Sequence, residues 1–224
     1  MKYLLGIYRP KFILTSLTIV ALLLSNIFLN DYSLQNGISV ILGSSSLAQN
    51  SDKICFLIFS LLIQNESAKT TSYYTKNFSY LLVRSGNKQG IVKIWVKHIL
   101  YNNFFIILNV CLVTVGVFVF LDFHNSFDFG YIVNLIVQGY SRCLIICFIQ
   151  MSLSLYKNSD KVFGIMMCII LLYTFIIQII FSNLYENELL CDLLTIARSI
   201  LSVLFAIISY YVFKNKFLKE WQII

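Results

Sequence analysis

The chain has 224 residues, of which 58% are hydrophobic and only 12% are charged. Soluble domains carry roughly 25% charged residues, so this chain has too few charges to cover a water-facing surface, and its composition excludes an ordinary soluble globular protein. The net charge of +7 comes in blocks of basic residues between apolar runs, a pattern typical of membrane topology and not of nucleic-acid binding.

Six continuous apolar runs predict an all-α, polytopic membrane protein with a single transmembrane domain, residues 1–224. The length suits about six spans of roughly 20 residues, and the absence of polar alternation within the runs favours helices over barrel strands. The predicted spans are residues 12–29, 53–69, 104–121, 131–156, 162–181 and 193–213. For the polar loop 30–52 between the first two spans, a re-entrant helix and an interfacial helix both remain open.

The basic residues fall on alternate sides of these spans. They gather before span one, between spans two and three, between spans four and five, and after span six: Lys2, Arg9, Lys11; Lys69, Lys76, Arg84, Lys88, Lys93, Lys97; Lys157, Lys161; Lys214, Lys216, Lys219. The opposite loops carry acids instead. Because cytoplasmic loops are enriched in lysine and arginine, we expect a multi-pass protein with both termini in the cytoplasm.

The segment 72–103, between spans two and three, is too polar to span and is predicted to be cytoplasmic and amphipathic. From Ile91 onward it has an apolar face that includes Trp95, and Gln89, Lys93 and Lys97 recur every four residues on the other face. One interpretation is an interfacial helix that orients the protein, with its tryptophan at headgroup depth. The other is a docking element for a cytoplasmic partner, with Arg84, Ser85, Asn87 and Lys88 at an exposed tip beside the turn predicted at Gly86–Gly90.

The stretch Tyr80–Lys88, together with Trp95 and Lys97 and the order of the spans, resembles the membrane permease subunits of bacterial ABC-2-type transporters. The nearest likeness is to small permeases of bacteriocin or lantibiotic export and immunity systems. The topology covers the whole chain, whereas the residue-level match is confined to this segment. The resemblance implies that a cytoplasmic ABC ATPase docks on Arg84, Ser85, Asn87, Lys88, Lys93, Trp95 and Lys97.

The resemblance also implies which molecules accompany the chain. ATP and Mg would be bound by the ATPase partner, and a second permease copy or a paralogous permease would complete the assembly, in contact with membrane lipids and a peptide substrate. We expect location in the cell membrane of a Gram-positive bacterium, which the abundance of Ile, Lys, Asn, Tyr and Phe also favours.

The sequence carries no catalytic signature. GxxxxGK[ST], HExxH and GxSxG are absent, so we expect neither a P-loop nor a zinc or serine hydrolase centre in this chain. We therefore predict no enzyme activity, no cofactor and no resident metal, and we read Asp122, His124 and Asp128 as a solvated outer loop. The six cysteines form no CxxC pair, and we interpret them as small packing residues.

Polar residues inside the spans form two stripes. Asn134, Gln138 and Arg142 recur every four residues in span four, and Thr195, Arg198 and Ser202 do so at spacings of three and four in span six. A charge near the bilayer centre costs on the order of 2.5 kcal/mol or more, so these stripes should face the bundle interior. Either they hold helices together, or they line a cavity for an amphipathic peptide or lipid-like substrate.

These features together predict a permease subunit that exports a hydrophobic or cationic peptide, in bacteriocin export or self-immunity. The alternative is a non-transporting membrane scaffold or immunity protein that binds a toxin or partner directly. The sequence leaves open the identity of the substrate, the direction of transport and whether the two permeases are identical.

Overall fold

The computed structural model describes residues 16–21, 24, 38, 41–42, 50–120, 129–155, 159–182 and 188–220, and this part of the chain is helical except at a few turn residues and contains no strands. The long elements are α3 (Asn50–Lys76), α4 (Phe78–Ser85), α5 (Lys88–Phe120), α6 (Phe129–Ser154), α7 (Ser159–Ser182) and α8 (Glu188–Glu220). The predicted all-α class is confirmed.

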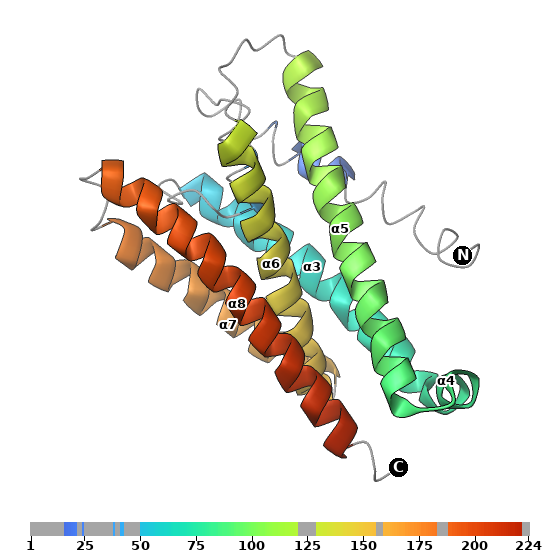
Figure 1. The fold of residues 1–224 in the computed structure, drawn as a ribbon. Helices are drawn as coiled ribbons and strands as arrows, with labels where there is room; N and C mark the ends of the chain where they lie inside the picture. The colour runs from blue at the N-terminus through green and yellow to red at the C-terminus, as the bar shows by residue number, and fades with distance from the viewer. Residues whose placement is uncertain are drawn as a thin grey trace.

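Helix α6 lies at the centre of the bundle. It contacts α3, α5, α7 and α8, and its most extensive packing is against α8. In Figure 1, α7 and α8 lie on one side of α6, α5 lies on the other, and α3 crosses behind it. The central position agrees with the burial of Leu135, Cys147 and Met151 along α6. Helix α8 instead leaves a broad apolar surface exposed, with Leu204, Phe205 and Ile208 about half exposed, as lipid contact requires.

Within the described residues, three helical stretches are long and apolar enough to cross a membrane: 88–117 in α5, 132–154 in α6 and 199–219 in α8. Helix α7 adds a shorter apolar stretch, 161–173. Helix α3, which contains the second predicted span, carries Glu66, Lys69 and Lys76 in its second half, and these charges dilute its apolar character. The chain is a helical membrane protein.

The predicted boundaries differ from the structure most clearly in α5. This helix runs without a break from Lys88 to Phe120, so the second half of the predicted amphipathic segment and the predicted span 104–121 belong to one helix. The first predicted span, 12–29, lies mainly outside the described residues. In the polar loop 30–52, Ile38, Ile41 and Leu42 are helical and almost completely buried, so apolar residues of this loop enter the bundle.

A tight elbow connects α3 to α5 through the short helix α4. Gly86 ends α4 in the left-handed conformation (φ 73°), and its amide donates to the carbonyl of Leu82 at 2.9 Å. Glycine adopts this φ without steric cost. The side-chain oxygen of Asn87 then accepts from the amide of Gly90 at 2.6 Å, which caps the start of α5. The predicted turn is thus confined to Gly86 and Asn87, because Lys88 already begins α5.

Replacing Asn87 by alanine should lower the free energy of unfolding by about 1 kcal/mol, because an alanine cannot accept the hydrogen bond from the Gly90 amide. Thermal unfolding of the purified protein in mild detergent measures this loss. Asn87→Ser retains an acceptor and should remain within a few tenths of a kcal/mol of the parent. A loss of the same size in both variants would contradict a capping role.

The elbow lies at the end of the bundle where α3 and α8 end. Phe78 of α4 meets Phe217 of α8 edge to face, with ring centroids 5.9 Å apart, and Figure 1 shows α4 and the C-terminus at the same end. Lysines gather here because each helix that ends or begins at this end carries them: Lys69, Lys76, Lys88, Lys93, Lys161, Lys214, Lys216 and Lys219. We call this end the basic end.

Candidate functional site: a basic elbow and buried polar seams

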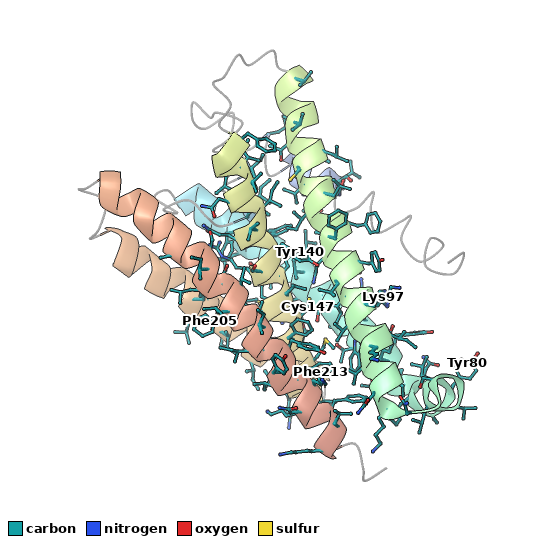
Figure 2. The ribbon with its side chains drawn as sticks, viewed as in Figure 1. Tyr80, Lys97, Tyr140, Cys147, Phe205 and Phe213 are labelled. Carbon is teal, nitrogen blue, oxygen red and sulfur yellow. The ribbon has the colours of Figure 1, made fainter. Side chains whose placement is uncertain are left out.

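The first turns of α5 separate a polar face from an apolar one. Gln89, Lys93 and Lys97 are exposed, and Lys97 Nζ lies 5.7 Å from the centre of the Tyr101 ring. Figure 2 shows Lys97 on the outer side of α5, away from the other helices. The opposite face is buried within the protein: Ile91, Val92, Trp95 and Ile99. This apolar face therefore packs on neighbouring helices.

Trp95 is enclosed in the bundle, which does not fit the docking contact expected for it from the sequence. Its side chain is 0% exposed. The ring stacks on Tyr74 of α3 at 4.9 Å, and it meets Phe213 of α8 edge to face at 5.2 Å. A cytoplasmic partner cannot contact a side chain enclosed in this way. The helical pattern placed Trp95 on the apolar face correctly, but that face meets protein and not headgroups.

Trp95 is the centre of a set of rings that we call the aromatic cluster: Tyr74, Phe78, Trp95, Phe213 and Phe217. Phe217 lies 5.8 Å from Trp95 and 5.9 Å from Phe78. The members come from α3, α4, α5 and α8, so the cluster joins the elbow to the end of the last helix. Aromatic pairs of this geometry contribute beyond their buried area.

The tip of the elbow carries the remaining predicted docking residues. Ser85 Oγ donates to the carbonyl of Asn87 at 3.0 Å. Asn87 is exposed, and Lys88 is half-buried. Arg84 lies in α4; its side chain is outside the described set. Tyr80 and Val83 belong to the stretch that carries the family resemblance but were not among the predicted docking residues, and they are 64% and 87% exposed on α4. Figure 2 shows Tyr80 pointing away from the bundle.

The predicted polar stripe of α6 meets α8 inside the bundle. Gln138 Nε2 donates to Ser199 Oγ at 2.7 Å, and Ser199 Oγ in turn donates to Asn134 Oδ1. Arg142 donates from one terminal nitrogen to Gln138 Oε1 at 3.2 Å. Ser202 is buried but donates to the Ser199 carbonyl of its own helix at 2.8 Å. The side chains of Thr195 and Arg198 lie outside the described set, and Ser199 makes the contact between the helices.

Arg142 also ties Leu42 to the centre of α6. Its other terminal nitrogen donates to the backbone carbonyl of Leu42 at 2.8 Å. Leu42 lies so close to Gly139 that a Cβ at residue 139 would be 2.9–3.0 Å from the leucine side chain. Backbone groups within a membrane bundle need internal partners, and Arg142 supplies one here.

A small cavity of about 10 Å³ lies beside this contact, lined by Leu42, Phe56, Phe59, Ser60, Ile63, Gly139, Arg142, Cys143 and Ile146. That volume has room for about one water molecule. It is too small for a peptide, so the conformation seen here holds no open substrate cavity at this position.

A second polar seam runs along α3 and was missed in the sequence. Ser60, Gln64, Ser67 and Thr71 are all buried at spacings of four, three and four. Gln64 Nε2 reaches the carbonyl of Phe163 in α7 at 2.8 Å. Most of these residues lie in the predicted span 53–69, and their helical spacing was a signal that the sequence analysis did not use. The side chains of Glu66 and Lys69 form an ion pair at 3.2 Å, in which Lys69 is 52% exposed and Glu66 only 12% exposed.

The contacts described above are hydrogen bonds and ring packing within the chain. Within the ranges that the structure describes, no three His, Cys, Asp or Glu side chains gather closely enough to hold a metal ion. Comparisons of the chain with protein-family models, curated proteins and solved structures return no match. Its function must therefore be argued from its own geometry.

Proposed function

We propose that the chain is the membrane-spanning permease subunit of an ATP-driven ABC transporter, and that the elbow at the basic end receives a separate cytoplasmic ATPase. The observation that carries this proposal is the elbow itself. A short amphipathic helix and the start of α5 present Tyr80, Val83, Lys93 and Lys97 outward while their inner faces are fixed to the bundle. A surface of exposed rings and cations on a rigid support suits protein docking.

The aromatic cluster supports the transmission of movement from this surface. Displacing the elbow would displace Trp95, and Trp95 contacts Tyr74 of α3 and Phe213 of α8 directly. Close-packed side chains transmit strain because they cannot deform continuously. ATP-driven closure of the partner would in this way shift α3 and α8 relative to α6, the helices that carry the buried polar seams.

The topology we propose has six crossings with both termini in the cytoplasm of a Gram-positive cell. The gathering of lysines at the basic end supports this orientation, since cytoplasmic ends are enriched in bases. We propose that α3, α7 and a helix before residue 30 complete the spans that α5, α6 and α8 provide. The transported molecule is a hydrophobic or cationic peptide, expelled in bacteriocin export or self-immunity.

The alternative is a non-transporting scaffold or immunity protein that binds a toxin directly. The observation that favours it is the size of the cavity beside Arg142, which is about 10 Å³ and far smaller than a peptide. A protein that only binds its target would need no larger opening.

Purification of the tagged protein from its native host in mild detergent distinguishes the two. The permease proposal predicts a co-purifying chain with a Walker A motif in near-equal amounts. Lys93→Glu with Lys97→Glu should remove that chain while the permease remains inserted, because the substitutions reverse two exposed charges on the docking face.

The matched control is Lys76→Glu with Lys219→Glu, which makes the same change in net charge at the same end of the bundle on exposed positions outside α5. It should retain the ATPase. Recovery of the chain alone, or with a peptide and no ATPase, would refute the permease proposal and favour direct toxin binding.

A further inference from the structure

Helix α8 is attached to the bundle along one narrow seam. Through this seam it packs against α6 and, near its end, against Trp95 of α5. The buried side chains of the seam recur on a single helix face: Ser199, Ser202, Ala206, Phe213 and Phe217. The large apolar side chains elsewhere on α8 are about half exposed, so this helix presents most of its circumference to the surrounding membrane.

The face of α8 opposite the seam carries a continuous apolar stripe. Its members are 43–57% exposed and recur every three or four residues, so they lie in line along the helix: Leu201, Phe205, Ile208 and Val212. From residue 201 to residue 212 the stripe rises through about 17 Å, close to the roughly 15 Å that one leaflet contributes to the hydrocarbon core. One acyl chain of a phospholipid can therefore lie along it.

At the basic end this face changes from apolar residues to hydrogen-bond donors. Tyr211, Asn215 and Lys219 recur every four residues, and all three are exposed. Lys214 and Lys216 are half-buried and lie to either side of them on the helix. A phenol hydroxyl, an amide and an ammonium group can all donate to the oxygens of a phosphate. The change of residue type thus follows that of a phospholipid, from acyl chain to headgroup.

The charges at this end of α8 favour an anion. Lysines outnumber acids by three to one in residues 214–220, where the acid is Glu220. Among all acids of the chain, the structure describes only the side chain of Glu66, and that carboxylate is paired with Lys69 on α3. Charge complementarity therefore selects a lipid whose headgroup is negatively charged.

The direction of α8 points its lysines toward the headgroups. Side chains on a helix lean toward its N-terminus. Because α8 ends at the basic end (Figure 1), Lys219 leans back toward the membrane. Helix α5 begins at the basic end, so Lys93 and Lys97 lean away from the membrane. This opposite lean separates the exposed face of α8 from the docking face of α5.

We propose that this exposed face of α8 binds an anionic phospholipid of the leaflet at the basic end. An acyl chain lies along the apolar stripe, and the phosphate accepts hydrogen bonds from Tyr211, Asn215 and Lys219. Lys214 adds positive charge beside the phosphate. The inference goes beyond the proposed function, and it holds whether or not an ATPase docks at the elbow.

Native mass spectrometry of the purified chain in mild detergent tests the proposal. The protein is titrated with phosphatidylglycerol and with phosphatidylcholine of the same acyl chains, which share a phosphate but differ in net charge. The parent should bind phosphatidylglycerol more tightly. Lys214→Gln with Lys219→Gln should weaken binding of phosphatidylglycerol about tenfold, because each lysine near an anionic headgroup adds to the attraction, and should leave binding of phosphatidylcholine unchanged.

The matched control is Lys69→Gln with Lys76→Gln, which makes the same change in net charge on two exposed lysines at the same end of the bundle. These lysines lie on α3, where Asn65 is exposed one turn before Lys69 and no apolar stripe leads to them. The control should weaken phosphatidylglycerol binding by no more than about twofold, because exposed charges away from the headgroup are screened. An equal loss in both pairs would overturn the site on α8, and equal affinity of the parent for the two lipids would overturn its selection of an anion.

Glycerol 3-phosphate, which carries the phosphate without acyl chains, distinguishes a lipid from a free phosphate compound. In large excess it should fail to displace phosphatidylglycerol, because it cannot contact the apolar stripe. Displacement would show that the donors bind phosphate alone, and would overturn the assignment of a lipid to this face.

Discussion

Replacing Trp95 by alanine is expected to lower the free energy of unfolding by about 3–5 kcal/mol, the range for deletion of a large buried aromatic side chain. The indole is 0% exposed and contacts Tyr74, Phe213 and Phe217, so its removal leaves a cavity where three helices meet. Thermal unfolding in mild detergent should show a lower midpoint. The elbow should also become more sensitive to protease, because α4 and α5 would lose their attachment to α8.

Two matched variants test whether the loss of buried ring contacts causes the lower stability. Trp95→Phe should recover most of the stability, since Trp95 Nε1 has no hydrogen-bond partner in the described residues and only ring area is lost. Ile94→Ala, at the neighbouring position and 46% exposed, should change stability by no more than about 0.5 kcal/mol. If Trp95→Ala left stability unchanged and only weakened binding of a partner, Trp95 would be an exposed docking residue and not a buried packing residue.

Trp95 also shows how far the sequence could predict this protein. The helical repeat assigned Lys93 and Lys97 to one face of α5 and Trp95 to the other, and the structure agrees on both faces. The repeat could not tell what the apolar face meets, because headgroups and neighbouring helices select the same residue types. Only the long-range contact with Phe213 of α8 decides between them.

The inward orientation of the polar stripe of α6 could be predicted from the sequence, whereas the residues that the stripe contacts could not. A charge in the middle of an apolar run required an inward orientation for Arg142, and Gln138 shared its face. The Arg142–Leu42 hydrogen bond joins residues 100 apart in sequence, and nothing local to either residue encodes that pairing. The α3 seam could have been predicted in the same way, because Ser60, Gln64, Ser67 and Thr71 recur at helical spacing, but none of them is charged and so none demanded an inward orientation.

Replacing Arg142 by methionine is expected to lower the free energy of unfolding by about 2–4 kcal/mol and to release Leu42 from its contact with α6. The substitution leaves the Leu42 carbonyl and Gln138 Oε1 without their donor, and each buried acceptor left unmatched costs about 1–3 kcal/mol. The free energy of unfolding, measured by thermal unfolding in mild detergent, should fall. A cysteine placed at Leu42, which is 1% exposed in the parent, should become reactive to a water-soluble maleimide.

The control for release is Gln138→Leu, which removes a neighbour of Arg142 but leaves its hydrogen bond to Leu42 in place. It should lower stability while the cysteine at residue 42 remains protected. Gly139→Leu should reproduce the release by a different route, because a side chain at residue 139 would occupy the space of Leu42. If Gln138→Leu exposed residue 42 as much as Arg142→Met, the Arg142 guanidinium would not be the group that holds Leu42 in place. The position of Arg142 in α6 would then be explained by its hydrogen bond to Gln138 alone.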